Sequence, residues 1–244
     1  MDISAVEYPK ISAPLASGLF DLGNRLSPLP QIELLGQTAL QRPEVECYIR
    51  DKFLRSYSAE IVHFLPQLLS MRCAGHLTGA AGIAIADRQP HLFLEHYLDV
   101  PIEAELGRLG LPHARRAEIA EIGNLVATTT GSSRVVFIVL ASLLHRLGLH
   151  WMVFTATGPL FATLQRLGFS LHRICPAEVA RLPASAQGNW GTYYEQRPAV
   201  VAGQLDDAMK LIASRPLFLA IQQLCSSQID TLVAEFEQML ESRC

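Results

Sequence analysis

The clearest pattern in the chain lies in residues 118–175, which read EIAEIGNLVATTTGSSRVVFIVLASLLHRLGLHWMVFTATGPLFATLQRLGFSLHRIC. Three apolar runs in this stretch have the length and residue types of buried strands, at 118–126, 151–156 and 169–174. The intervening patterns predict a helix over 134–147, ended by Gly148, and a second over 158–167, ended by Gly168. This alternation predicts a locally parallel sheet with right-handed crossovers.

The preceding residues predict further elements of the same domain. Apolar residues recur with helical spacing over 44–57, and Ala74-Gly75-His76 is a turn signal between two strand-like runs. Residues 1–43 contain Pro28 and Pro30 and show no sustained period, which is typical of an extended arm. The expected order is therefore an arm (1–43), a helix (44–57), a hairpin (64–73 and 79–86), and a short helix that opens near Pro101.

After residue 190 the sequence predicts a strand-like segment to 201 and helix from 206 onward. The last helix carries one apolar stripe, formed by Ile229, Leu232, Val233, Phe236, Met239 and Leu240, opposite acidic side chains. The stripe fits docking on its own domain, a homodimer contact or a membrane surface, and the acidic opposite face disfavours the membrane. We expect an arm at 1–43, a main domain at 44–205 and a helical extension at 206–244.

Composition excludes several classes of function. A net charge of −3 over 244 residues provides no basic field for nucleic acid. The longest apolar run, 135–144, is too short to span a membrane, and the start of the chain lacks a secretory pattern, so we expect a cytoplasmic protein without a membrane span. The five cysteines form no CxxC pair and the eight histidines show no HxH or HxxxH spacing, so we expect neither a disulfide framework nor a metal site.

Four spaced motifs resemble the thermostable hemolysin family over roughly residues 45–205. They are FLEHYLDVP at 93–101, AEIGNL at 120–125, WMVFTAT at 151–157 and WGTYY at 190–194. That family is similar in layout to GNAT acyltransferases and acyl-homoserine-lactone synthases. The resemblance implies an α/β fold of the GNAT-like (acyl-CoA N-acyltransferase) type, in which helices flank a mixed sheet, with a C-terminal helical extension here.

The resemblance also implies a place for the donor. GNAT enzymes have a loop of Gln or Arg, two residues, Gly, one residue, then Gly or Ala, and Thr128, Gly131 and Ser133 occupy the three defined places. A polar loop at a helix N-terminus presents free N–H groups to phosphates, although an ordinary Ser/Thr helix cap has the same form. We therefore expect acyl-CoA or an acyl-phosphopantetheine carrier protein as co-substrate, and no permanently bound cofactor. The residues expected to bind the co-substrate are Thr128, Thr130, Gly131, Ser132, Ser133 and Arg134.

Glu121 is the candidate general base. It lies within a strand among apolar residues, where desolvation raises the pKa of a carboxyl and suits it to remove a proton from an amine. Pairing with Arg115 or Arg116 is the structural alternative. Asn124 projects to the opposite face of a regular strand and joins the site only through a bulge, which Gly123 would permit. GNAT-like folds have such a bulge on this strand.

Candidate residues for the acceptor come from two of the family-like motifs: Glu95, His96, Tyr97, Trp190 and Tyr193. His96 and the aromatic residues fit structural packing as well. A tyrosine on the second helix often protonates the leaving thiolate in GNAT enzymes, but Leu164 occupies that place here. The acid is then Tyr193, Tyr194, water or no group at all.

These features predict transfer of an acyl group, preferably a fatty one, from a pantetheine thioester to an amine-bearing small molecule. The alternative is a non-catalytic or directly membrane-active hemolysin-like protein that retains the fold. A lytic phenotype does not establish a pore, because an enzyme that makes a surface-active acyl product also causes lysis.

Overall fold

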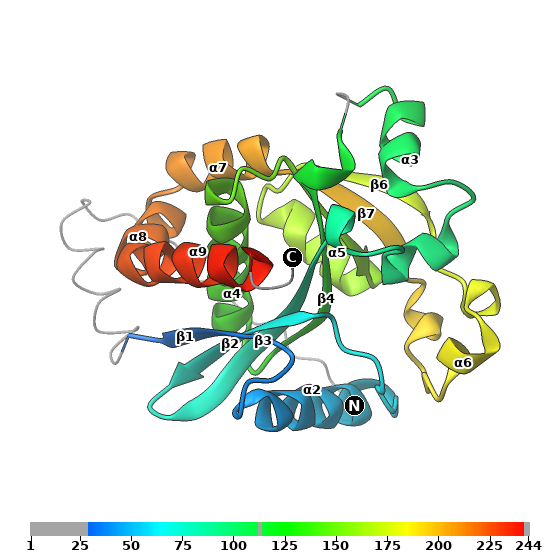
Figure 1. Ribbon diagram of the computed structural model, residues 1–244, viewed down its shortest axis with the longest axis horizontal. Helices are drawn as coiled ribbons and strands as arrows, with labels where there is room; N and C mark the ends of the chain where they lie inside the picture. Colours follow the sequence, from blue (N-terminus) through cyan, green and yellow to red (C-terminus); the bar gives the residue numbers. More distant parts are fainter. Residues whose placement is uncertain (1–28, 112–113, 242–244) are drawn as a thin grey trace, which may run out of the picture.

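A seven-stranded mixed sheet forms the centre of the computed structural model, which describes residues 29–111 and 114–241 (Figure 1). The strand order is β1-β2-β3-β4-β5-β7-β6. The strands are β1 (Gln31–Leu35), β2 (Gln67–Cys73), β3 (His76–Ile85), β4 (Ile119–Ala127), β5 (Trp151–Ala156), β6 (Leu171–Pro176) and β7 (Ala199–Gln204). Most of the predicted arm lies outside the described residues.

The predicted hairpin is confirmed. Cys73 pairs with His76 across a two-residue turn, in which Ala74 has φ 49° and Gly75 has φ 78°. Two consecutive positive φ angles match the right-handed twist of the flanking strands. Residues 31–35, which the sequence analysis assigned to the arm, form β1 and pair antiparallel with β2.

The parallel sheet predicted for the central stretch is only partly correct. β4 and β5 are parallel, with Ile119 opposite Trp151 and Ile122 opposite Phe154. β6, however, does not lie beside β5, because β7 inserts between them and pairs antiparallel with both. Residues 199–204 pair with strands that lie far away in the sequence, and local sequence patterns do not predict such pairing.

The most buried helix is α4 (Thr130–Arg146), whose residues 135–144 are all buried. It begins four residues before the predicted start, because the Thr129 side chain accepts a hydrogen bond from the backbone N–H of Ser132 and caps the helix. The predicted polar loop therefore includes the first turn of α4. One face of α4 contacts the sheet, and Figure 1 shows the C-terminal helices gathered around its other side.

These C-terminal helices are α7 (Leu205–Ser214), α8 (Pro216–Leu224) and α9 (Ser226–Glu241). The stripe residues Ile229, Leu232 and Phe236 of α9 are at most 1% exposed and belong to the same core cluster as α4. The structure thus places the apolar stripe against its own domain, the first of the three alternatives. No helix in the described ranges is long and apolar enough to span a membrane.

The other α-helices of the described residues are α2 (Arg42–Tyr57), α3 (Ile102–Arg108), α5 (Gly158–Arg166) and the single turn α6 (Ala184–Gln187). Residues 190–194, predicted to be strand-like, instead form turns against the C-terminal end of α2. The Thr192 N–H donates to the Tyr57 carbonyl at 2.7 Å, and a Cβ on Gly191 would lie 2.0 Å from the same oxygen. Glycine at position 191, with φ 49°, is therefore required for this contact.

Candidate active site

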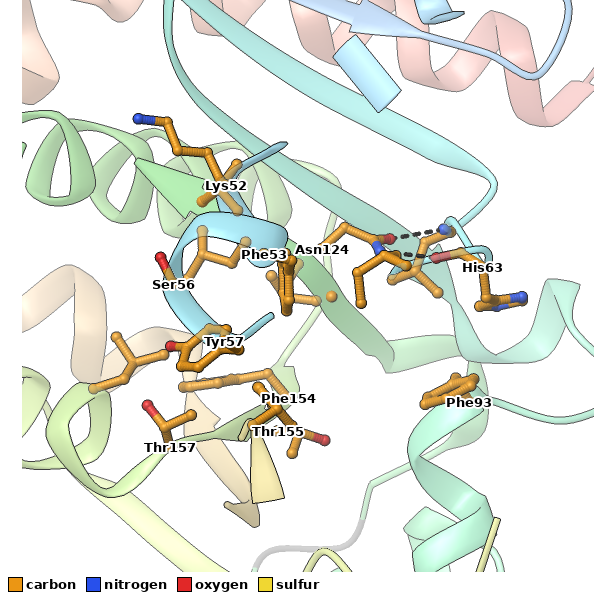
Figure 2. Close-up of a pocket in the computed structure, with 18 of the residues that line it drawn as sticks. Lys52, Phe53, Ser56, Tyr57, His63, Phe93, Asn124, Phe154, Thr155 and Thr157 are labelled. Carbon is orange, nitrogen blue, oxygen red and sulfur yellow. Dashed lines mark hydrogen bonds between the residues drawn. The ribbon is translucent and has the colours of Figure 1, made fainter. Parts of the chain in front are cut away.

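A cavity of about 300 Å³ opens where β4 and β5 diverge. Their ladder ends at the pair Ile122 and Phe154, and the following β4 residues up to Ala127 line the cavity. α2 and the turn at 190–193 complete the wall, as Figure 2 shows for the α2 side. The backbone edge of β4 after Ile122 therefore faces this space instead of a neighbouring strand.

A bulge in β4 creates the divergence. Ala80 pairs with Val126 and Gly82 with Gly123, so two β4 residues stand opposite one β3 residue. Asn124, with φ 50°, adopts the left-handed conformation, whereas the sequence analysis assigned this freedom to Gly123. Gly123 is needed for space instead, since a Cβ there would lie 3.0 Å from the Leu65 side chain.

Both polar atoms of the Asn124 side-chain amide are hydrogen-bonded to backbone groups. Its Oδ1 accepts from the Leu65 N–H at 3.0 Å, and its Nδ2 donates to the His63 carbonyl at 3.0 Å (Figure 2). Asn124 thus fastens the segment before β2 to the bulge. Asn124 also lines the cavity, and its predicted catalytic role stays a prediction.

Glu121 lies one residue before the end of the β4–β5 ladder and is 4% exposed. Its carboxylate accepts the backbone N–H groups of Phe93 at 2.8 Å and Leu94 at 3.0 Å. Desolvation raises the pKa of Glu121 to about 8, against the opposing effect of these two hydrogen bonds. A carboxyl with this pKa and a place in the cavity wall is suited to proton transfer near neutral pH.

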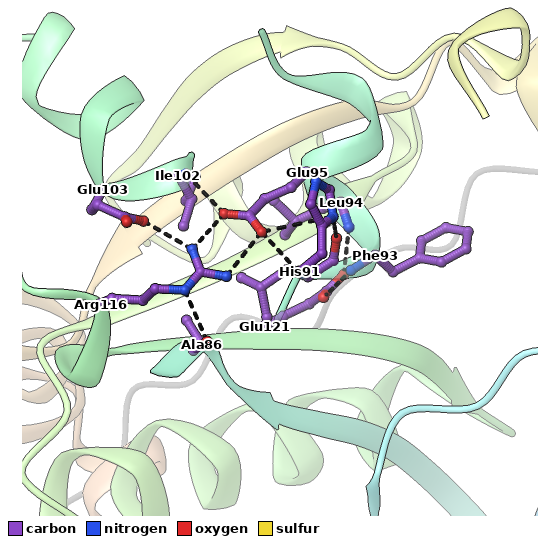
Figure 3. A network of polar contacts seen from close by, with 10 residues as sticks. Ala86, His91, Phe93, Leu94, Glu95, Ile102, Glu103, Arg116 and Glu121 are labelled. Carbon is purple, nitrogen blue, oxygen red and sulfur yellow. Dashed lines mark hydrogen bonds and ion pairs between the residues drawn. The ribbon is translucent and has the colours of Figure 1, made fainter. Parts of the chain in front are cut away.

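Arg116, proposed as a partner of Glu121, instead binds Glu95 (Figure 3). Its guanidinium donates to the two Glu95 oxygens at 2.6 and 3.0 Å, and to Glu103 at 3.0 Å. Glu95 also accepts the N–H groups of Leu92 and Ile102, and its pKa is lowered to about 2 by these bonds despite its burial. Both Glu95 oxygens are thus hydrogen-bonded, and Glu95 lies outside the lining of the cavity in which it was predicted to bind substrate.

The other candidate acceptor-binding residues lie either in the cavity lining or outside it. Tyr97, Trp190 and Tyr193 line the cavity, whereas His96 lies outside its lining and stacks on His91 with ring centroids 4.9 Å apart. The Tyr97 hydroxyl is 2.7 Å from that of Tyr194. Burial raises the pKa of Tyr193, so its phenol stays protonated at neutral pH.

Two basic side chains of the lining were missed by sequence reasoning. His63 stacks on Phe93 with ring centroids 5.1 Å apart, and burial lowers its pKa. Lys52 lies over the Tyr48 ring at 5.4 Å, and the Tyr48 hydroxyl contacts the Thr128 hydroxyl at 2.9 Å. His63 lies in an irregular segment and Lys52 on the polar face of a helix, so no local pattern identifies either.

The predicted donor residues surround the N-terminus of α4. Ser133 lines the cavity, and its hydroxyl donates to the Thr129 carbonyl. Thr130 and Gly131 open the helix, where backbone N–H groups have no intrahelical partner. Among the described residues, the buried Nε of Arg134 has no hydrogen-bond partner. The structure thus places one end of the cavity at a helix N-terminus that favours anions.

Comparison with known proteins matches the chain to one family and to several solved structures. The model of the family described as thermostable hemolysin matches residues 35–209. No curated protein matches the chain significantly.

The similar structures share the fold at low sequence identity. TofI in an apo form is 16% identical, with a TM-score of 0.54 over 78% of this chain and 98% of that one. FeeM, an N-acyl amino acid synthase from uncultured soil microbes, is 11% identical, with a TM-score of 0.50 over 78% and 98%. BjaI, a CoA-dependent acyl-homoserine lactone synthase crystallised with SAM and isopentyl-CoA, is 10% identical, with a TM-score of 0.50 over 76% and 89%. The mixed α/β sheet is thus of the GNAT-like type predicted.

Proposed function

The chain belongs to the thermostable hemolysin family, and we propose that it transfers an acyl group from a pantetheine thioester to an amine. The observation that carries this proposal is the buried Glu121 carboxylate in the wall of the cavity where β4 leaves β5. A buried carboxyl of raised pKa beside an open strand edge provides a proton acceptor and a docking edge in one place.

We place the donor along the free edge of β4 and the N-terminus of α4. Pantetheine is an extended chain with two amides, so the β4 edge after Ile122 can bind it as a strand would be bound. Its phosphate then reaches the N-terminus of α4, near Lys52 and Ser133, where N–H groups and a cation favour negative charge. Acyl-CoA and a carrier-protein phosphopantetheine share this chemistry, and we propose either as donor.

The acyl group lies among apolar side chains. Phe137, Phe154 and Leu160 line the cavity on the side of α4 and α5. Burial of methylene groups against such side chains contributes about 0.8 kcal/mol for each CH₂. This lining favours a hydrocarbon acyl chain.

In the reaction, Glu121 accepts a proton from the amine, and the nitrogen lone pair attacks the thioester carbonyl carbon. The C–N bond forms, the C–S bond then breaks, and the sulfur leaves with the electron pair and takes up one proton. Water in the cavity supplies this proton, or Tyr193 supplies it and regains one from water, since Tyr193 lines the cavity and Tyr194 is paired with Tyr97. The products are an amide and a free thiol.

The test is release of thiol from an acyl-CoA or acyl-carrier thioester, measured with a thiol reagent. We expect release that requires both the donor and an amine. Release that is equally fast without an amine would indicate a thioesterase, and no release from donors of any acyl length would contradict the proposal.

Gly131→Asp should weaken binding of the thioester donor by about tenfold or more, because its carboxylate would meet the donor phosphate at the helix N-terminus. An acidic residue in the first turn suits the helix itself, so folding should be retained. Gly131→Ala is the matched control, since a Cβ at this position would meet only Thr129 Oγ1 at 3.7 Å. Titration of CoA by calorimetry measures the effect, and equal affinity in the two variants would refute the donor site.

Direct membrane activity is the competing function, and vesicle leakage separates the two. The apolar stripe of α9 is buried in its own domain, so the folded protein lacks this surface for insertion. We expect no release of dye from anionic phospholipid vesicles without thioester and amine. Leakage that needs neither substrate, and that Glu121→Gln retains, would favour the membrane-active alternative.

A further inference from the structure

The two ends of the cavity differ in charge and chemistry. Lys52 and Ser56 lie at the end near α4, whereas His63 and Phe93 lie at the opposite end (Figure 2). The Glu121 carboxylate belongs to the second end, since it is hydrogen-bonded to the backbone of Phe93. The donor phosphate therefore meets a cation, whereas the acceptor meets a buried carboxyl group and aromatic rings.

The end at Glu121 is walled by rings. Phe93 stacks on His63 and lies 6.3 Å from both Trp190 and Tyr97, measured between ring centroids. Trp190 in turn lies 5.4 Å from Tyr193. Ring faces attract a cation within about 6 Å through their quadrupole. The wall therefore favours an ammonium group or an uncharged ring in the acceptor.

A carboxylate in the acceptor would have no cationic side chain of the described lining to pair with at this end. Among the described residues of the lining, Lys52 is the one lysine or arginine, and it lies at the donor end. The nearby Arg116 is paired with Glu95 and Glu103. His63 has a lowered pKa and is therefore neutral at pH 7 and above. Above pH 8, where Glu121 is ionised, a substrate carboxylate would instead approach the Glu121 carboxylate, which repels it.

We propose that the acceptor is an amine without a carboxylate group, bound with its nitrogen at Glu121 and its body against Phe93 and Trp190. This inference rests on the proposed acyl transfer and specifies its acceptor class. Arylalkylamines fit the site better than amino acids, because the ring wall receives the aromatic body and the carboxylate charge is absent.

The test compares tyramine with tyrosine, and phenethylamine with phenylalanine, as acceptors for one acyl-CoA. Rates of amide formation are measured by mass spectrometry. At pH 9, where Glu121 is ionised, we expect each amine to exceed its amino acid by about tenfold or more in kcat/KM, because like charges repel each other at close range. Tyrosine methyl ester is the matched ligand control, since it keeps most of the tyrosine structure without the negative charge, and it should regain most of the rate.

His63→Arg adds a cation to the acceptor end and should lower the ratio of kcat/KM for tyramine to kcat/KM for tyrosine. His63→Gln adds no cation and should leave this ratio as high as in the wild type. Equal or faster acylation of the amino acids by the wild type would overturn the acceptor class while leaving acyl transfer intact. Failure to acylate any amine, with no thiol released, would overturn the proposed function and this inference with it.

Discussion

Glu121→Gln should lower kcat for acyl transfer by about 10²- to 10⁴-fold, the usual contribution of a general base. The amide keeps the size of the carboxyl group and cannot accept the proton of the amine. Steady-state rates of thiol release with saturating donor and amine measure the loss. A rate within twofold of the wild type would exclude Glu121 as the base.

The pH dependence provides a second readout of the same group. Burial raises the pKa of Glu121 to about 8, so the reactive carboxylate forms as the pH rises through that value. In the wild type kcat should therefore increase from pH 6 to pH 9 with a midpoint near 8, and Glu121→Gln should lose this increase. A midpoint near 4.5 would show that the carboxyl is not desolvated in the enzyme–substrate complex.

Stability must be measured alongside, because Glu121 also binds two backbone groups. A glutamine has one acceptor oxygen for the N–H groups of Phe93 and Leu94, so one of them loses its partner at a cost of about 1–3 kcal/mol. Removal of a buried charge offsets part of this cost above pH 8. Glu118→Gln, in the partly exposed turn before the same strand, is the matched control and should retain activity, with a loss of stability of less than about 1 kcal/mol.

Arg116→Leu should lower the free energy of unfolding by about 3–5 kcal/mol, because it leaves Glu95 charged and buried without a counter-ion. The Glu95 side chain is 3% exposed and that of Arg116 is 23% exposed. Arg115→Leu is the control, since the Arg115 side chain is 75% exposed and its ion pair with Glu118 should contribute less than about 1 kcal/mol. Urea unfolding of both variants at pH 7 measures the difference.

The lowered pKa of Glu95 determines how the free energy of unfolding changes with pH. A carboxyl with a folded-state pKa of about 2 and an ordinary value of 4.5 stabilises the fold above pH 4.5, and this contribution disappears as the pH falls toward 2. The stability gap between the wild type and Arg116→Leu should therefore shrink over this range. A gap that is small at pH 7, or independent of pH, would mean that Arg116 does not neutralise Glu95.

Local patterns predicted the elements whose own residues carry a periodic pattern or a turn signal. The hairpin of β2 and β3, helix α2 and strand β5 follow from periodicity and turn signals, and β5 has the predicted bounds of 151–156. Where β7 lies could not be predicted, because its position between β5 and β6 is decided by pairing over more than 20 residues of sequence. The early start of α4 was missed because a threonine cap was read as loop.

Within the candidate site, sequence reasoning placed Glu121 in a buried strand and related Asn124 to a bulge, as the structure shows. It assigned Glu121 as the base and Glu95 as an acceptor-binding residue, but it could not predict which of the two acidic side chains lines the cavity. The distinction lies in tertiary partners, an arginine for Glu95 and two backbone N–H groups for Glu121. Lys52 and His63 enter the cavity only through the packing of α2 and of the segment before β2.

The most direct test of the account is the mass of the product made from a ¹³C-labelled acyl thioester and a ¹⁵N-labelled amine. We predict one amide that carries both labels, formed by the wild type and reduced at least about 100-fold in Glu121→Gln. A ¹³C-labelled free acid without ¹⁵N, or a doubly labelled amide formed equally by both proteins, would contradict acyl transfer at this cavity.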